Sequence, residues 1–159
     1  MSLTPIDQAF ETLLGSLTSI DESESLPLIA CNGRVLAKDL GSPVNVPPLT
    51  NSAMDGYAMR TADLADEQTV LKVTQRIAAG QIGSSLAAGE AARIFTGAPI
   101  PEGADAVVVQ ENCKAENDSV IVLQNPARGE NLREAGEDVK AGATLLKTGH
   151  RLLPQDIGL

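Results

Sequence analysis

The octet Asn51-Ser52-Ala53-Met54-Asp55-Gly56-Tyr57-Ala58 places an amide, a hydroxyl, a carboxylate and a phenol side by side in one short stretch. Asp55-Gly56 is a dipeptide typical of tight turns, and Tyr57-Ala58-Met59-Arg60 reads as the start of a strand. Three prolines between residues 43 and 48 precede the octet and favour extended backbone. Spacing alone therefore favours an Asp-Gly hairpin turn with solvated neighbours. The alternative is a carboxylate fixed between a rigid entry and a strand.

The pattern after the octet is that of short strands. Leu71, Val73, Gln75 and Ile77 alternate and are predicted to share one face of a strand. Residues 91–95 predict another strand, and the apolar run 106–110 predicts a strand covered on both faces. A turn at 116–118 leads into residues 119–123 and predicts a hairpin, and 143–146 predicts a last strand. We interpret residues 44–134 as a compact β-rich subdomain.

Both ends of the chain, residues 1–43 and 135–159, are predicted to form a linker subdomain. Thr4 is expected to cap a helix with Pro5 at its first position. The helix has one apolar face, made by Ile6, Ala9, Phe10, Leu13, Leu14 and Leu17. Packing of this face on its own domain is favoured over a dimer seam. Residues 26–30 predict a short strand, and residues 32–37 predict a turn followed by a short helix.

The expected fold class is therefore mixed and predominantly β, with an N-terminal amphipathic helix, a linker subdomain made from both chain ends and an inserted β-rich subdomain. Residues 154–159 predict the first turn of a helix. Because a domain rarely stops one turn into a helix, we expect the chain to be part of a longer protein.

Composition restricts the class of function. The net charge is −9 and aromatic residues make up 2% of the chain, which argues against binding to nucleic acid or to an anionic membrane. No leader of the secretory type and no run of about 20 apolar residues is present, so we expect a cytoplasmic protein. Cys31 and Cys113 fit no paired metal-ligand spacing and are expected as free thiols, with a single disulfide as the alternative.

Polar turns supply the candidate site residues. They are the octet, the stretch from Thr96 to Asp105, and Arg133 to Asp138. No nucleophile–base–acid triad can be assembled, since His150 is the only histidine and has no partner that spacing suggests. The turns offer carboxylates and a hydroxyl, Asp55, Thr96, Glu137 and Asp138, which suit Mg²⁺ with bound water and an oxyanion.

In this order and spacing, the turns resemble the molybdopterin molybdenumtransferase family, which includes MoeA and the related domain of gephyrin. The matching strings are the octet, Thr96-Gly-Ala-Pro-Ile-Pro-Glu-Gly103, Gly33-Arg34-Val35-Leu36-Ala37, and Arg133 with Gly136-Glu137-Asp138. The resemblance runs from about residue 4 to residue 159.

The resemblance implies an activity and a context. Family members insert molybdate into adenylylated molybdopterin with release of AMP, the last step of molybdenum cofactor biosynthesis, and use a divalent cation, usually Mg²⁺. They are cytoplasmic homodimers supplied by an upstream molybdopterin adenylyltransferase. The chain resembles their N-terminal half, so the family's later α/β domain and final β domain are expected to lie outside it.

Carried over by position, the resemblance implies catalytic roles for Asp55, Thr96 and Asp138, with a structural role as the equal alternative for Asp138. Asp55 would organise Mg²⁺ or steer molybdate, and Thr96 would offer its hydroxyl to an oxyanion. Asn51, Ser52 and Arg133 are the implied substrate-binding residues. Many relatives are more basic after Arg133, where this chain has Glu134-Ala135, which weakens anion binding by that turn.

Two hypotheses follow. In the first, the chain is the N-terminal segment of a molybdenumtransferase and is inactive alone. In the second, it is a non-catalytic dimerisation or scaffold module of the gephyrin type. Continuation of the gene past Leu159 into a Gly-rich α/β domain would favour the first.

Overall fold

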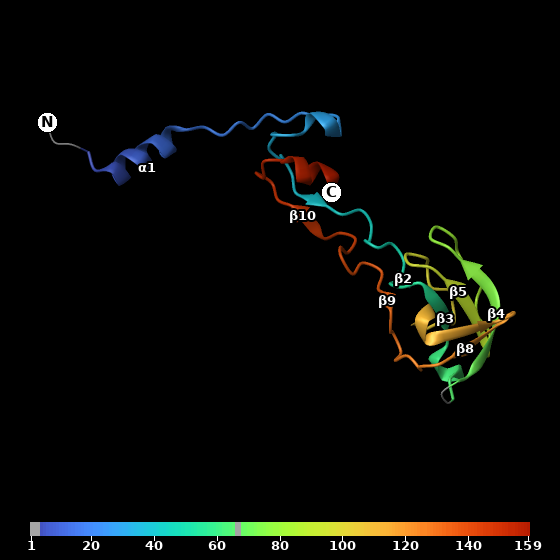
Figure 1. The fold of residues 1–159 in the computed structure, drawn as a ribbon. Helices are drawn as coiled ribbons and strands as arrows, with labels where there is room; N and C mark the ends of the chain where they lie inside the picture. The colour runs from blue at the N-terminus through green and yellow to red at the C-terminus, as the bar shows by residue number, and fades with distance from the viewer. Residues whose placement is uncertain (1–3, 66–67) are drawn as a thin grey trace. The chain divides into compact units, whose positions relative to one another are not determined.

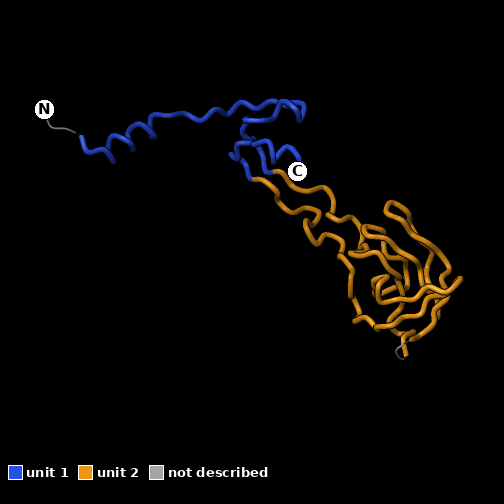
Figure 2. The backbone as a smooth tube through the Cα atoms, viewed as in Figure 1, with its two compact units in different colours: residues 1–39, 147–159 blue, residues 40–146 orange. Residues whose placement is uncertain are grey.

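The computed structural model describes residues 4–65 and 68–159. The chain divides into two units, residues 1–39 with 147–159 and residues 40–146, coloured separately in Figure 2. The first unit is thus built from both ends of the chain and the second from its middle. Whether residues 44–134 fold as a separate subdomain stays a prediction.

From residue 4 onward, the first unit contains three helical segments, α1 (Ile6–Ser16) and the 3₁₀ turns η1 (Leu28–Ala30) and η4 (Pro154–Gly158). Between them, the backbone of residues 33–36 pairs with that of residues 149–152, as in the Leu36 N–H to His150 carbonyl bond of 2.9 Å. The strand predicted at residues 26–30 is wrong, and so is the helix predicted after Asn32, where a turn leads into an isolated bridge between Val35 and Arg151.

Two local predictions for this unit are corrected by the side chains. The N-cap of α1 is Pro5 rather than Thr4, and no side chain caps the helix. His150 does have a partner, because its Nε2 lies 2.8 Å from Oδ2 of Asp156 in η4. The same oxygen accepts the backbone N–H of Leu153 at 2.8 Å. These two hydrogen bonds lower the pKa of Asp156, with that from His150 the larger cause.

The apolar face of α1 is not packed on its own domain. No residue of the helix is buried, and Ile6, Phe10, Leu13 and Leu17 are all more than half exposed. The favoured interpretation of this face is therefore wrong for the described chain. A short helix gains most of its stability from packing rather than from propensity, and the described chain offers α1 no packing surface.

The second unit holds ten short strands and two 3₁₀ turns in its described residues: β1 (Leu40–Gly41), β2 (Asn51–Ser52), β3 (Gly56–Met59), η2 (Thr61–Asp63), β4 (Val70–Ile77), β5 (Glu90–Ile94), β6 (Ala106–Val109), η3 (Gln110–Asn112), β7 (Cys113–Glu116), β8 (Ser119–Val122), β9 (Leu132–Arg133) and β10 (Thr144–Leu146). Six of them form one curled sheet, of which β3, β4, β5 and β8 are labelled in Figure 1. The strand order of this sheet is β6-β3-β5-β4-β8-β7. Only the β4–β5 pairing is parallel within that sheet. The pairs β1–β10 and β2–β9 form two small ribbons. The predicted hairpin is confirmed as β7–β8.

Apolar side chains cover both faces of the six-stranded sheet. One cluster includes Met59, Leu71 and Val108, and the other includes Ala58, Ile77 and Val107. Adjacent residues of β6 thus enter different clusters, which confirms the strand covered on both faces. Both cysteines are free and half-buried, and burial raises the pKa of Cys113 to about 11.

A β-bulge in β4 overturns the prediction of one shared face. The register against β5 shifts between Val73 and Gln75. An extra residue at a bulge reverses the side-chain alternation beyond it. Leu71 therefore packs in the first cluster and Ile77 in the second.

The octet is not a hairpin. Its first strand, β2, pairs with β9, whereas its second, β3, lies between β5 and the edge strand β6 of the large sheet. Gly56 is the first residue of β3 rather than a turn glycine, and its φ is not positive. The Asp-Gly dipeptide is instead selected by close approach: a Cβ on Gly56 would lie 1.9 Å from the Val108 carbonyl oxygen.

Candidate functional site

Asp55 directly precedes β3 and is held there by Thr96. The Asp55 oxygen Oδ1 accepts the Thr96 backbone N–H at 2.8 Å and its hydroxyl at 2.7 Å. Gly56 pairs with Ile94, so the residue before β3 and the loop after β5 are brought together by the strand register. The second carboxylate oxygen, Oδ2, takes part in none of the hydrogen bonds between described residues. One oxygen is thus fixed by Thr96, and the other is free of hydrogen bonds to the described residues.

The surroundings of Asp55 favour its ionised form. The backbone hydrogen bond from Thr96 lowers the pKa of Asp55 most, its hydroxyl hydrogen bond adds to this, and the charge of Arg93 lowers the pKa further. Because the folded pKa lies below the ordinary value of 3.8, the stabilising contribution is present above that value. It is lost as the pH falls through the folded pKa. Asp55 is therefore a carboxylate at neutral pH.

Replacement of Thr96 by Val tests this arrangement. The variant keeps the backbone N–H but removes the hydroxyl, so the pKa of Asp55 is expected to rise toward its ordinary value. Thr96→Ser retains the hydroxyl and is expected to leave the pKa near that of the wild type. Carboxyl-detected NMR titration measures both. An unchanged pKa in Thr96→Val would show that the hydroxyl does not hold the carboxylate.

Thr96 is therefore placed to position Asp55. The prediction gave its hydroxyl to a substrate oxyanion, but here its proton is donated to the carboxylate. The hydroxyl oxygen keeps acceptor capacity, which does not suit an anion. The catalytic role of Thr96 stays a prediction.

Ser52 holds the octet together from inside. Its side chain is 1% exposed, and its hydroxyl donates to the Met54 carbonyl at 2.5 Å. Its backbone accepts from Gly97 and donates to Ala98, which ties β2 to the loop that carries Thr96. The substrate-binding role of Ser52 stays a prediction, and the structure gives it a buried position.

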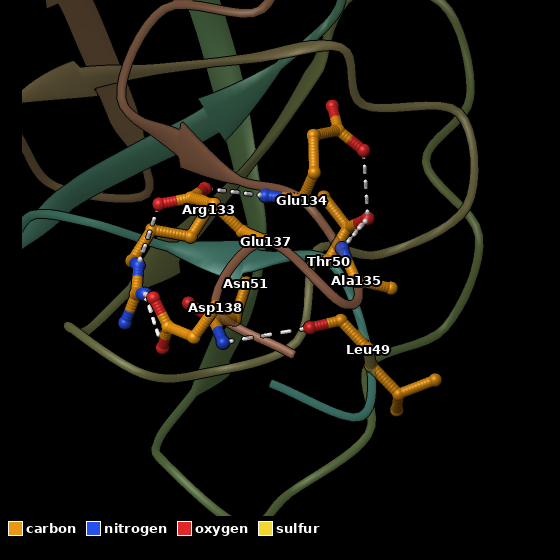
Figure 3. A network of polar contacts seen from close by, with 8 residues as sticks. All are labelled: Leu49, Thr50, Asn51, Arg133, Glu134, Ala135, Glu137 and Asp138. Carbon is orange, nitrogen blue, oxygen red and sulfur yellow. Dashed lines mark hydrogen bonds and ion pairs between the residues drawn. The ribbon is translucent and has the colours of Figure 1, made fainter. Parts of the chain in front are cut away.

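Arg133 and Asp138 form a forked ion pair (Figure 3). The Nη2 atom of Arg133 lies 2.6 and 2.7 Å from the two Asp138 oxygens, and its Nε lies 3.3 Å from Glu137 Oε1. The hydrogen bonds to Asp138 and then Glu137 raise the pKa of Arg133. Both acids already occupy the guanidinium, so Arg133 and Asp138 are engaged with each other.

Asn51 lies opposite this ion pair. It is in direct register with Arg133 across β2 and β9, and its side-chain amide donates to the Leu49 carbonyl at 3.4 Å. Beside it, the Thr50 hydroxyl donates to Glu134 at 3.3 Å and accepts the Ala135 N–H (Figure 3). The chain thus brings Asp55 together with Thr96, and Asn51 together with Arg133 and Asp138.

Sequence reasoning missed Arg93. Its Nη1 donates to the Gly56 carbonyl at 2.7 Å, and its Nη2 donates to the Gln110 side chain at 2.6 Å. The guanidinium also lies over the rings of Tyr57 and Phe95. The available signal was an arginine inside the apolar run from Ala91 to Phe95. Such a residue is paired or functional more often than not.

Whether the chain itself can hold a Mg²⁺ ion depends on how its carboxylates are grouped. In residues 4–65 and 68–159, no group of three or more His, Cys, Asp or Glu side chains could hold a metal ion. Asp55 can offer one free oxygen, which agrees with the few protein ligands that Mg²⁺ takes beside water and phosphate. The described residues thus fit one ligand of a site, not a complete one.

No helix in the described part of the chain combines the length and apolar character needed to cross a membrane.

The model for the MoeA N-terminal region (domain I and II) matches residues 4–159. Molybdopterin molybdenumtransferase of Haemophilus influenzae is 39% identical over 155 residues, which are 97% of this chain and 38% of that protein. The enzyme of the same name from a Nostoc species is 40% identical over 92% of this chain and 35% of its own length. The chain spans less than half of these relatives.

Solved structures agree with the sequence relatives. The crystal structure of the molybdopterin biosynthesis moeA protein of Pyrococcus horikoshii OT3 superimposes with a TM-score of 0.91 at 37% identity. The match covers 99% of this chain and 43% of that one. The predicted fold class is confirmed by this likeness. The family model spans nearly the whole sequence, including the octet and the turns with Thr96 and Asp138, and the chain belongs to the MoeA N-terminal region family.

Proposed function

We propose that the chain is the N-terminal segment of a molybdopterin molybdenumtransferase. The intact protein inserts molybdate into adenylylated molybdopterin and releases AMP in the last step of molybdenum cofactor biosynthesis. The observation that carries this proposal is the Asp55 carboxylate. It lies in the octet of a chain whose relatives bear that enzyme name, and it is fixed through one oxygen with the other free.

Among the residues of this chain, Asp55 is the one proposed to contact the metal ion or the molybdate directly. Its second oxygen would hold Mg²⁺ or steer the incoming molybdate, and Thr96 keeps the carboxylate in place. When bound, Mg²⁺ would supply positive charge that offsets the charge of the anionic substrates. The pairing of Asn51 with Arg133, and the ion pair of Arg133 with Asp138, stabilise the β2–β9 ribbon. The same proposal includes contacts of these three residues with the substrate.

The remaining partners follow from the family. The intact protein is a cytoplasmic homodimer and receives its substrate from a molybdopterin adenylyltransferase. The unburied apolar face of α1 supports the dimer, because an exposed face of this kind marks an interaction surface. A separate groove in the same unit is lined in part by apolar residues, among them Ile20, Leu26, Val35 and Leu152.

Charge placed on the α1 face is expected to dissociate the dimer. Phe10→Glu in the intact protein buries an unpaired carboxylate in the proposed interface and is expected to weaken dimerisation by more than about tenfold. Glu11→Gln changes a charge on the same helix and serves as the control. Sedimentation velocity over a concentration series measures both. A Phe10→Glu dimer as tight as the control would contradict this interface.

The proposed activity is tested with the intact protein. Adenylylated molybdopterin, Mg²⁺ and limiting molybdate are expected to yield AMP and molybdenum cofactor in equal amounts. The chain of 159 residues alone is expected to give neither. AMP release without cofactor, or no reaction by the intact protein, would contradict the proposal.

A scaffold or dimerisation module of the gephyrin type is the second candidate. The exposed α1 face favours it, since such a face needs no catalytic partner domain. This candidate predicts unchanged cofactor yield when Asp55 is substituted.

A further inference from the structure

Two arginines lie next to each other at the end of the sheet that carries Asp55. Arg76 of β4 is in direct register with Arg93 of β5. Both guanidinium groups lie over the Phe95 ring, at 4.3 Å for Arg76 and 4.4 Å for Arg93 from the ring centroid. Phe95 directly precedes Thr96, and Arg93 donates to the carbonyl of Gly56, the residue after Asp55. The arginine pair is therefore adjacent to the proposed site.

Neither arginine of this pair has an acidic side chain in direct contact among the described residues, although the charge of Arg93 acts on Asp55. By contrast, Arg128 of the same unit forms a salt bridge with Asp105, with 3.5 Å between its Nε and the Asp105 Oδ2. Like charges on directly opposed strand positions destabilise a sheet. In a chain of net charge −9, two adjacent unpaired arginines form a local positive patch.

The two side chains differ in how firmly they are held. Arg93 is half-buried and donates to three neutral oxygens, those of Gly56, Ile94 and the Gln110 side chain, at 2.7, 3.0 and 2.6 Å. These bonds fix the position of the Arg93 side chain, but the neutral oxygens do not cancel its positive charge. Arg76 is exposed, and no hydrogen bond between described residues involves it. Its five N–H donors are therefore available to a ligand.

We infer that Arg76 and Arg93 form a binding site for a tetrahedral oxyanion beside Asp55. Arginine forks bind such oxygens through charge-assisted, paired hydrogen bonds, and stacking on Phe95 limits the freedom of Arg76 before the ligand arrives. The ligand is a phosphate group of a nucleotide or free molybdate, which share this shape and charge. Only the choice between these two rests on the proposed function. Arg93, held by its hydrogen bonds, is the fixed part of the site. The exposed Arg76 donates its N–H groups to the ligand.

The test is a titration of the chain with inorganic phosphate, molybdate and AMP at constant ionic strength. Backbone and arginine side-chain N–H signals are followed by NMR. Binding is expected with a Kd on the order of a millimolar, with shifts centred on residues 76 and 93–96. Arg76→Gln is expected to weaken it by about tenfold or more. Arg128→Gln removes the same charge from the same unit and is expected to change the Kd by less than about twofold.

A Phe95→Leu variant distinguishes binding that depends on the stacked arginines from binding that depends on net charge alone. It keeps both arginines but removes their stacking surface, so it is expected to weaken binding while the melting temperature reports that the unit is folded. AMP binding more tightly than phosphate assigns the site to the nucleotide, and molybdate binding more tightly assigns it to the metal oxyanion.

Equal Kd values for wild type and Arg76→Gln, or equal losses in Arg76→Gln and Arg128→Gln, would overturn the site. Neither result bears on the proposed activity, which is measured by cofactor formation in the intact protein.

Discussion

Gly56→Ala is expected to destabilise the second unit by about 4 kcal/mol or more, a loss seen only for severe backbone conflicts. A Cβ at this position would lie 1.9 Å from the Val108 carbonyl oxygen and 2.8 Å from its carbon. Backbone atoms cannot rotate away as a side chain can, so β3 and β6 must separate. Since a domain is stable by only 5–15 kcal/mol, roughly half of that stability is lost. Thermal unfolding is expected to shift down by roughly 20 °C.

Gly41→Ala is the matched control. It lies in β1 of the same unit, its φ is not positive, and an added Cβ would meet the Ala143 carbonyl oxygen at an ordinary 3.7 Å. Its melting temperature is expected within a few degrees of the wild type. If Gly56→Ala melts with the control, the close approach of β3 and β6 does not exist in solution.

Sequence patterns located the β-rich region because local signals were strong there. The run Ala106–Val109 and the turn between β7 and β8 depend on neighbouring residues alone. The bulge in β4 left no such signal, since Gln75 continues an alternation that looks regular. Which face a residue takes after a bulge is decided by its partner strand.

The octet shows the same limit. Asp-Gly is an expected hairpin dipeptide, and only the pairing of β3 with β5 and β6 shows that Gly56 is a strand residue without room for a side chain. Likewise, amphipathic spacing found α1 but could not tell that the described chain offers it no partner.

The candidate site was predictable in its residues and not in its contacts. Resemblance pointed to Asp55, Thr96, Arg133 and Asp138, but not to which of them meet. Asp55 and Thr96 lie 41 positions apart, and their hydrogen bond depends on β3 and β5 being neighbours. Arg76 and Arg93 become adjacent only through the parallel register of β4 and β5.

Asp55→Asn in the intact protein is expected to reduce molybdate insertion by about 100-fold while leaving the fold intact. The amide oxygen can still accept both hydrogen bonds from Thr96, so the turn is retained. What is lost is the negative charge at the second oxygen. That charge is proposed to hold Mg²⁺ or to steer molybdate. Asp118→Asn, at an exposed turn between β7 and β8, is the matched control and is expected to keep full activity.

The most direct measurement is the yield of molybdenum cofactor from adenylylated molybdopterin at limiting molybdate by the intact wild type, Asp55→Asn and Asp118→Asn proteins. Circular dichroism and thermal melting confirm that all three are folded. Of the three proteins, Asp55→Asn alone is expected to lose cofactor formation. Wild-type yield from folded Asp55→Asn would contradict it and would favour the scaffold module.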